Sequence, residues 1–194
     1  MQKKQFSDQK NFALKRLNEA LKKGEVDKEI LPIVNYFNSL EDFYTTSTCA
    51  GRIVLLQDLG SKKEDFHVER WHRKVKFSEL KKSLEKLPDK GTTRLIQESG
   101  ILHMVARKSE KGILLLKIAL VSGFKHSGFQ VFKEPRFLVE ICGSERIDVP
   151  IAMDGKLLVN EQYLKYLTKL ANEKFLKSQK KLKRLEKALK DNLN

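Results

Sequence analysis

Apolar positions recur at helical spacing at both ends of the chain. Near the N-terminus they predict a helix over Phe6–Lys23, which Gly24 would end because glycine adopts a positive φ without steric cost. A second helix is predicted from Asp27, a good N-cap, through Phe37. From Asn160 to about residue 190 the pattern again steps by three and four, as along a packed helix edge or a coiled-coil seam. The residues of this seam are Leu164, Leu167, Ala171, Phe175, Ser178, Leu182, Leu185 and Leu189.

Between these helices the period changes to that of strands. The sequence predicts strands at IVLLQ, at Phe66–Val75, at FQVF and at RFLVEIC, with one or two further strands around Gly100 and helices over 78–87 and 109–123. Asp154 and Gly155 predict a tight hairpin turn because both tolerate positive φ. Strands and helices mix without βαβ alternation. We therefore expect an α+β fold in a single domain over residues 1–194, with a mixed, largely antiparallel sheet flanked by helices.

The net charge of the chain indicates which kind of partner it binds. The chain has 194 residues, with 39 Lys and Arg against 25 Asp and Glu, for a formal net charge of +14. A surplus of this size favours polyanions, chiefly nucleic acid, although a merely basic surface is the alternative. Eight basic residues and one acid lie between Lys174 and Lys190, so this part of the long last helix carries +7. Such a run is either a solvated helix face or a contact surface for RNA or DNA, for which Lys177, Lys181 and Arg184 are the candidates.

Several classes of protein are excluded by missing motifs. The sequence has no GxGxxG and no GxxxxGK[ST], which argues against a Rossmann-like dinucleotide-binding fold and against a P-loop hydrolase. Its two cysteines, Cys49 and Cys142, form no CxxC pair, and its four histidines form no HExxH, so no metal site is expected. We find no signal peptide and no apolar stretch of about 18 residues, and therefore expect a cytoplasmic protein without membrane contact.

The stretch YTTSTCAGR, from Tyr44 to Arg52, concentrates polar residues before an apolar run. One interpretation is a loop whose hydroxyls, glycine backbone and Arg52 hold an anionic ligand, because arginine grips a carboxylate or phosphate through two parallel hydrogen bonds. A structural turn is the alternative. A nucleophilic Cys49 is a third, although no histidine base is adjacent in sequence.

Further polar residues could join such a site. SGFKHSG at Ser122–Gly128 and GSERIDVP at Gly143–Pro150 are Gly/Ser corners that are either turns or ligand contacts. Arg146 and Asp148 are two apart and would share one side of an extended strand. His103, in ILHMVAR, is either a hydrogen-bonded core residue or a base. Trp71 and His72 stand among basic residues, as base stacking would require, although a lone tryptophan is usually core.

Taken in order, these motifs resemble the wybutosine-synthesising protein 3 family of tRNA methyltransferases. The resemblance is carried by VDKEILPIVNYFNSLEDFYTTSTCAGRI, ILHMVAR, GFKHSGF, RIDVP, LLVNEQYL and LANEKF, and covers nearly the whole chain. Members usually have Ser-Ser-Cys-Ser-Gly-Arg where this chain has Ser47, Thr48, Cys49, Ala50, Gly51 and Arg52. These two replacements exchange one small residue for another.

The resemblance implies a function and a set of site residues. The donor would be S-adenosyl-L-methionine, and the acceptor the N4 ring nitrogen of a tricyclic guanosine derivative beside the anticodon of tRNA-Phe. The residues expected to hold the donor are Ser47, Cys49, Gly51, Arg52, Ser122, Gly123, Ser127 and Gly128. Those expected to contact the modified base or the anticodon stem-loop are Arg146, Asp148, Trp71, His72, Lys177, Lys181 and Arg184. His103 is the candidate proton acceptor.

Two other functions are consistent with the sequence. A non-catalytic basic RNA-binding protein would use the same corners to bind phosphates. A structural protein would use the seam from Leu164 to Leu189 to dimerise.

Overall fold

The computed structural model describes residues 2–193, and these gather into two compact units. The first unit comprises Met1–Ala50, Gly100–Ser144 and Gln179–Asn194, and the second comprises Gly51–Ser99 and Glu145–Ser178. Each unit has a buried core of its own. The chain passes between the units four times, so no single linker segment in the sequence separates them.

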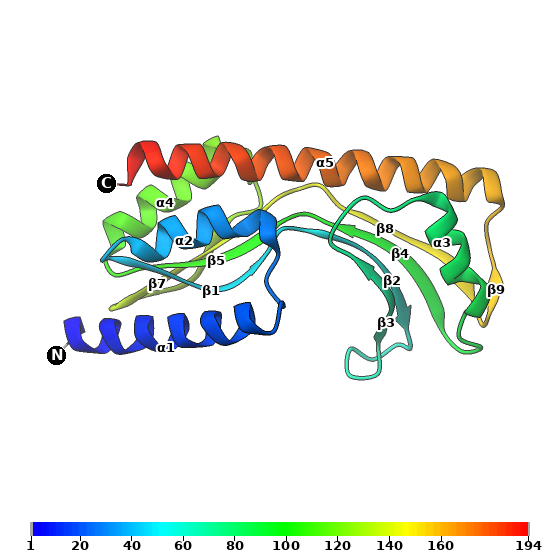
Figure 1. The fold of residues 1–194 in the computed structure, drawn as a ribbon, viewed down its shortest axis with the longest axis horizontal. Helices are drawn as coiled ribbons and strands as arrows, with labels where there is room; N and C mark the ends of the chain where they lie inside the picture. The colour runs from blue at the N-terminus through cyan, green and yellow to red at the C-terminus, as the bar shows by residue number, and fades with distance from the viewer. Residues whose placement is uncertain (1, 194) are drawn as a thin grey trace. The chain divides into compact units, whose positions relative to one another are not determined.

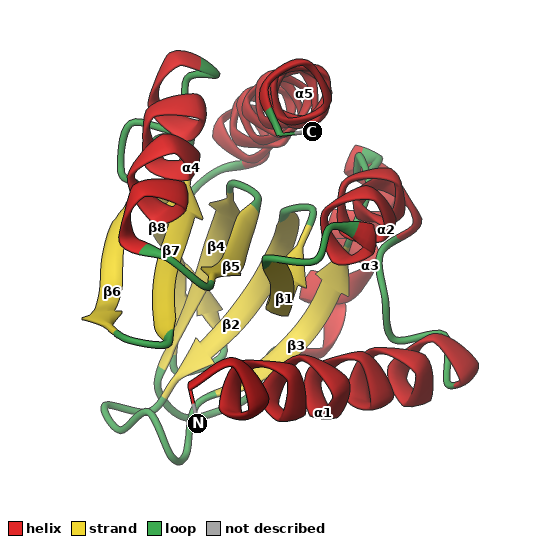
Figure 2. Ribbon diagram, turned by 90° about the vertical axis from the view of Figure 1, so that its left-hand side faces the viewer, coloured by secondary structure: helices red, strands yellow, loops and turns green. Residues whose placement is uncertain are grey.

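The first unit is a four-stranded antiparallel sheet with helices on both faces (Figures 1 and 2). Its strands lie in the order β1-β5-β7-β6, and its helices α2 and α4 cover the face opposite to α1. The bounds are α1 Gln2–Lys22, α2 Leu31–Ser39, β1 Phe43–Cys49, β5 Ile101–Ala106, α4 Ser109–Val121, β6 Gly128–Lys133 and β7 Arg136–Cys142.

The two faces of this sheet are filled differently. Under α2 and α4 lies an apolar core that includes Leu102, Met104 and Val139. The opposite face has a smaller cluster under α1, in which Phe6 packs edge-on against Tyr44 with ring centroids 5.2 Å apart. The α1 cluster reaches Val105 but not the neighbouring residue on that face of β5, His103. Alternation along β5 therefore gives an apolar face and a face that is apolar only under α1.

The first motif of the sequence is a strand and not the expected loop. Residues from Phe43 to Cys49 form β1, which pairs with β5. A β-bulge at Thr46 shifts the register, so that Thr45 faces Met104 while Ser47 faces His103. The loop interpretation was wrong because polar composition was read as a turn, whereas threonines pair well in an edge strand.

The cap predicted for the second helix was also wrong. Asp27 precedes a 3₁₀ turn at Lys28–Ile30, and its side chain makes no capping hydrogen bond. Its carboxylate instead accepts a hydrogen bond from the Ala50 backbone N–H, with 2.7 Å between Oδ2 and N. Asp27 therefore stabilises the end of β1 and not the start of α2.

The second unit is a five-stranded antiparallel sheet in the order β3-β2-β4-β8-β9. Its elements are β2 Arg52–Asp58, β3 Phe66–Trp71, α3 Phe77–Ser83, β4 Thr92–Glu98, β8 Ile147–Met153 and β9 Lys156–Leu157. The hairpin predicted at Asp154 and Gly155 is confirmed, with φ of 48° and 74°. All strands that pair in both units are antiparallel, in agreement with the predicted α+β class.

The long helix α5, Glu161–Asn192, contributes to both cores. It starts as predicted at Asn160, whose Oδ1 accepts a hydrogen bond from Tyr163 N at 2.9 Å. Leu164, Leu167, Ala171 and Phe175 belong to the core of the second unit, whereas Leu182, Leu185 and Leu189 belong to that of the first. The seam is therefore occupied by the chain itself, which argues against its use in dimerisation. No helix within residues 2–193 is long and apolar enough to cross a membrane.

Asn172 ties α5 to the segment that leads into α3. Its Oδ1 accepts from Val75 N at 2.9 Å and its Nδ2 donates to Val75 O at 2.8 Å. We expect N172A to lower the free energy of unfolding by about 1–3 kcal/mol, because the backbone N–H and C=O of the buried Val75 both lose their hydrogen-bond partner. Urea titration measures the loss. The matched control, N192A, removes an exposed hydrogen bond and should change stability by less than about 0.5 kcal/mol. Equal losses in the two variants would contradict the assignment.

Candidate functional site

A row of polar positions crosses the sheet of the first unit. Strand pairing places Ser47 opposite His103, His103 opposite Glu140, and Glu140 opposite Gly128. Residues directly opposite each other in antiparallel strands point to the same face. One residue from each of the four strands therefore contributes to a single line, and three of them, Ser47, His103 and Gly128, are predicted site residues.

The centre of this row is a hydrogen-bonded pair. Nε2 of His103 lies 2.8 Å from Oε2 of Glu140, and the two side chains are 31% and 25% exposed. Gly128 leaves space beside them, because a Cβ built there would meet no atom within 4 Å. The row is thus neither a closed core nor a fully solvated surface. Such half-exposed titratable pairs are suited to ligand binding and proton transfer.

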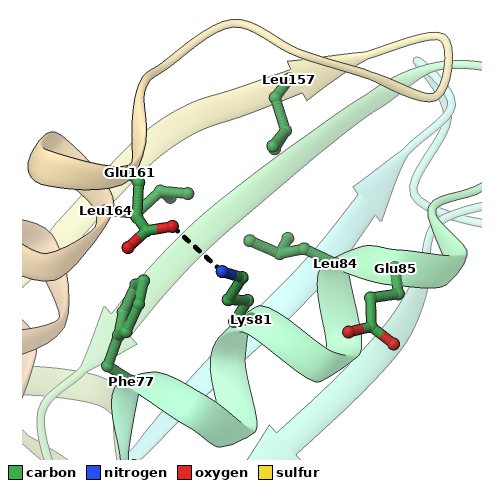
Figure 3. Close-up of a pocket in the computed structure, with 7 residues that line it drawn as sticks. All are labelled: Phe77, Lys81, Leu84, Glu85, Leu157, Glu161 and Leu164. Carbon is green, nitrogen blue, oxygen red and sulfur yellow. Dashed lines mark hydrogen bonds and ion pairs between the residues drawn. The ribbon is translucent and has the colours of Figure 1, made fainter.

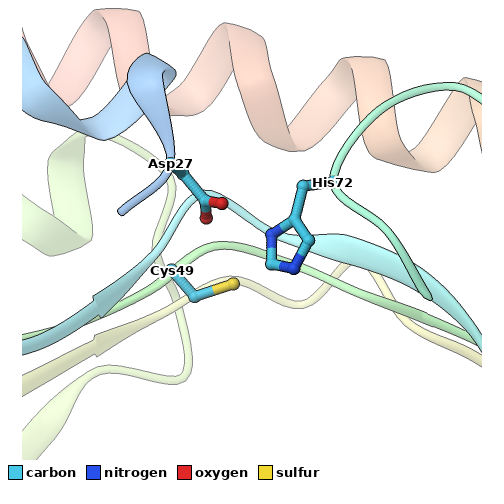
Figure 4. Close-up of side chains that lie close together, drawn as sticks. All are labelled: Asp27, Cys49 and His72. Carbon is cyan, nitrogen blue, oxygen red and sulfur yellow. The ribbon is translucent and has the colours of Figure 1, made fainter. Parts of the chain in front are cut away.

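Cys49 lies one position further along the same face. It pairs with Ile101, which pairs with Cys142. A carboxylate oxygen of Asp27 lies within 4.8 Å of the Cys49 sulfur (Figure 4). The next residue, Ala50, donates its N–H to Asp27 and accepts a hydrogen bond from Gln179 Nε2 at 2.7 Å. The backbone at this motif is therefore fixed by the protein's own side chains, where the sequence had suggested exposed amides for a ligand.

The corner from Ser122 to Gly128 is mainly structural, because its serine side chains face the protein. Ser122 is buried. Ser127 donates its hydroxyl to Phe124 O at 2.7 Å and accepts from Cys142 N at 3.1 Å. The polar groups of this corner that remain outward are those of Lys125 and His126, both exposed.

Gly123 brings two of the predicted RNA contacts next to this corner. A Cβ on Gly123 would lie 3.3 Å from Lys181 Cε and 3.3 Å from Arg184 Nη2, both on α5. With Lys125 and His126 these side chains form a basic corner within the first unit, to which we refer by that name below. The positive φ of Gly123, 97°, ends α4 and permits this close approach.

The second unit carries a network of ion pairs on the sheet face opposite its core. Arg52 bonds Glu98 at 2.6 Å, and Arg146 reaches Glu98 at 3.5 Å and Asp148 at 2.9 Å. Arg94 continues the network to Asp148 at 2.7 Å and to Asp58 at 3.8 Å. Three arginines are thus matched by three carboxylates. Arg146 is 56% exposed against 29% for Arg52, so it is the better placed of the two for a ligand's carboxylate.

Electrostatics in this network follow from burial and pairing. Burial by itself would raise the pKa of Asp148, but hydrogen bonds from Arg146 and Arg94 outweigh it and the pKa is lowered. On the same sheet, partial burial lowers the pKa of His67, and the charges of Arg70 and Arg52 lower it further. His67 is therefore neutral at pH 7.

The remaining predicted residues of the second unit differ in their surroundings. Trp71 is only 6% exposed and packs in the core, so the prediction that its ring stacks on a base was wrong. The indole faces inward because it pairs with Ile53, a core position of β2. His72, the third side chain in Figure 4, is half-buried just after β3. Lys177 is exposed on α5.

A pocket of about 180 Å³ lies elsewhere in the second unit (Figure 3). It is bounded mainly by apolar side chains, among them Phe77, Leu84, Leu157 and Leu164, and an ion pair of 3.0 Å joins Lys81 to Glu161 at its edge. None of the predicted site residues lines it.

Sequence reasoning missed the two glutamates that organise these sites. Glu98 follows the apolar residues Leu95 and Ile96 in β4, and Glu140 interrupts the apolar run of β7; each is the single carboxylate of its strand. That interruption was a usable signal, because a charge at a half-buried strand position requires a partner. His103 and Arg52 are the partners that the structure supplies.

Comparison with known proteins assigns the class. A model of the family described as Methyltransferase TYW3 matches residues 8–191. The chain therefore belongs to this family of methyltransferases, and the resemblance found in the sequence is confirmed.

Relatives extend the match over nearly the whole chain. A Thermococcus sibiricus protein named tRNA(Phe) 7-((3-amino-3-carboxypropyl)-4-demethylwyosine(37)-N(4))-methyltransferase is 40% identical over 185 residues, 94% of this chain and 93% of its own. A Pyrococcus horikoshii protein of that name, numbered 1, is 36% identical over 93% of each chain. The solved structure of PH1069 from Pyrococcus horikoshii has a TM-score of 0.90 at 34% identity, covering 96% of both chains. A hypothetical protein from Aeropyrum pernix has a TM-score of 0.76 at 25% identity, covering 86% of this chain and 99% of its own.

The lowered pKa of Asp148 predicts an acid-dependent contribution to stability. A group whose pKa is lower in the folded state stabilises the fold above its unfolded pKa, about 3.9, and loses that contribution as pH falls through the folded value. We therefore expect D148N to be less stable than the wild type at pH 6, and the difference to shrink steadily below about pH 4. Urea titrations between pH 6 and pH 3 measure it. A difference that stays constant over this range would contradict the ionic role of Asp148.

Proposed function

We propose that this protein methylates the N4 ring nitrogen of 7-(3-amino-3-carboxypropyl)-4-demethylwyosine in tRNA(Phe), with S-adenosyl-L-methionine as the methyl donor. The family membership and the 35–40% identity to several relatives named for this reaction support the proposal. In the structure itself, the half-exposed His103–Glu140 pair supports it most directly. We place the reaction in the cytoplasm.

The chemistry demands little of the protein beyond binding and alignment. A sulfonium donor supplies an activated methyl group, so no covalent enzyme intermediate is required. What the protein must provide is an oriented acceptor nitrogen and an outlet for the proton that it loses. His103 fits the second task because imidazole accepts protons near neutral pH and the ring is partly open to the face of the sheet.

The second unit has a guanidinium suited to a substrate carboxylate. Both the donor and the aminocarboxypropyl side chain of the base have a carboxylate. Arg146 is the guanidinium we assign to one of them, since it is more exposed than Arg52 and its contact with Glu98, at 3.5 Å, is looser. Ser47 and Cys49, on the face with His103, are assigned to contacts with the donor or the base.

The anticodon stem-loop is assigned to the cations of α5. Lys177 and Arg184 are exposed on a helix whose other face is buried, Lys181 is half-buried next to them, and Lys181 and Arg184 belong to the basic corner. The acids nearby are few: between Lys174 and Lys190 only Glu186 is acidic, and it pairs with Lys190 at 2.6 Å. Unlike the balanced network of the second unit, this surface retains the charge that backbone binding needs.

Labelled donor and precursor tRNA test the proposed function directly. The purified protein is incubated with methyl-labelled S-adenosylmethionine and with tRNA from a strain that lacks it, and the nucleosides are separated by mass. We expect one methyl group to be added to the demethylwyosine derivative alone. Calorimetry with the donor in the absence of tRNA should show binding. Binding of tRNA without donor binding or transfer would favour the non-catalytic RNA-binding protein instead.

Charge removal on α5 tests the RNA surface. In K181A/R184A the slope of log K against log salt concentration should become shallower by about 1.5, because each lost phosphate contact accounts for about 0.7–0.9. Affinity for the donor should stay the same. The matched control is K190A, whose ammonium is neutralised by Glu186 and which should leave the slope nearly unchanged. Filter binding of tRNA at four salt concentrations measures the slope for the double variant and for the control. An unaltered slope in the double variant would remove the basic corner from the RNA interface.

A further inference from the structure

We infer that Glu140 is a positioning residue for methyl transfer, and that it makes Nδ1 of His103 the atom that accepts the proton. This inference rests on the proposed function, because it concerns the proton released from the acceptor nitrogen. Glu140 was not a candidate in the sequence, and the contact that reveals it joins residues 37 positions apart.

Backbone pairing holds the two side chains in place. β5 lies between β1 and β7, and β7 lies between β5 and β6, so both residues come from inner strands of the sheet. His103 and Glu140 are directly opposite each other, in a run of six consecutive pairs without a bulge. The distance of 2.8 Å between Nε2 and Oε2 is therefore set by the register of two inner strands and not by a mobile loop.

The carboxylate determines which ring nitrogen carries the hydrogen. An ionised glutamate only accepts hydrogen bonds, so the Nε2 atom next to it must be the donor. In neutral imidazole the other nitrogen then has the lone pair. Nδ1 is left as the acceptor, in the way that a carboxylate fixes the tautomer of a histidine in metal sites and hydrolases.

The proton balance of the reaction is then complete. The lone pair of the ring nitrogen forms the N–CH₃ bond while the C–S bond of the donor breaks and its electrons stay on sulfur. The nitrogen loses its proton to Nδ1 of His103. The resulting imidazolium is stabilised by its hydrogen bond to the Glu140 carboxylate.

A purely structural role for Glu140 predicts different behaviour. Half-exposed ion pairs contribute little to stability, so a glutamate kept for the fold alone would be exchangeable with glutamine. Its neighbours in β7, Val139 and Ile141, are apolar and buried, so a neutral residue at this position would be less costly to desolvate. Two measurements distinguish the structural role from the positioning role: the kcat of Glu140 variants and the tautomer of the His103 imidazole.

Steady-state kinetics of E140Q and H103A, alone and combined, test the inference. We expect E140Q to lower kcat by about 10- to 100-fold with KM for donor and tRNA changed less than about threefold. The combined variant should be no slower than H103A, because Glu140 acts only through His103. The matched control is E110Q, an exposed glutamate of α4 in the same unit, which should retain wild-type kcat. Additive losses in the combined variant, or a kcat for E140Q like that of E110Q, would overturn the inference.

A second measurement needs no turnover. Long-range ¹H–¹⁵N NMR spectra of the free protein report which nitrogen of each histidine is protonated, and the signal of His103 is assigned by its loss in H103A. We expect the Nε2–H tautomer in the wild type and a mixture or the Nδ1–H tautomer in E140Q. An Nδ1–H tautomer in the wild type would refute the inference, even where methylation itself is observed. Conversely, a correct tautomer with no methyl transfer would refute the proposed function alone.

Should E140Q fail to fold, E140D takes its place in both experiments. The shorter side chain keeps the charge but withdraws the carboxylate from Nε2. A reduced kcat with unchanged KM is expected, and a wild-type kcat together with a wild-type tautomer would count against any requirement for the carboxylate at this distance.

Discussion

The register of the first sheet is the constraint on which the candidate site depends. A one-residue slip in any strand would turn its side chains to the other face, because side chains alternate with a period of two. The bulge at Thr46 makes this explicit: without it, Ser47 and Cys49 would point to the core side, and Thr46 and Thr48 would stand beside His103. Core packing fixes the remaining strands, since Leu102, Met104 and Val139 must all face α2 and α4. The polar row is therefore held in place by apolar residues on the opposite side of the same strands.

Local features of the fold could be predicted from the sequence, whereas the pairing of distant residues could not. The start of α5 at Asn160, its seam and the Asp154–Gly155 hairpin depend on residues within a few positions of each other, and all are confirmed. His103 was noticed because it interrupts an apolar strand, but the same signal at Glu140 has meaning only once β5 and β7 are known to be neighbours. Asp27 and Trp71 were misread for the same reason. Folding brings Ala50 to the carboxylate of Asp27, which accepts its N–H, and surrounds Trp71 with the apolar core of the second unit.

The distribution of charge separates two kinds of basic residue. Three arginines of the second unit, Arg52, Arg94 and Arg146, are each bonded to a carboxylate of the same sheet, so this network carries little net charge. The lysines of α5 are mostly exposed, and few acids accompany them. A count of basic residues does not distinguish these cases. Long-range attraction of a polyanion comes from the surface with an excess of positive charge, while arginines balanced by carboxylates can recognise an anion only by exchanging partners.

Neither unit is continuous in the sequence, and this affects how the chain can fold during its synthesis. The first core is completed by Leu182, Leu185 and Leu189, and the second by Leu164 and Phe175, all on the final helix. A nascent chain that lacks this helix can form hairpins but cannot close either core. Vectorial, domain-by-domain folding on the ribosome is therefore unavailable to this protein. Both cores can close only after residues 161–192 have been synthesised, and a chain truncated before residue 160 would have two open hydrophobic faces for proteases and chaperones to recognise.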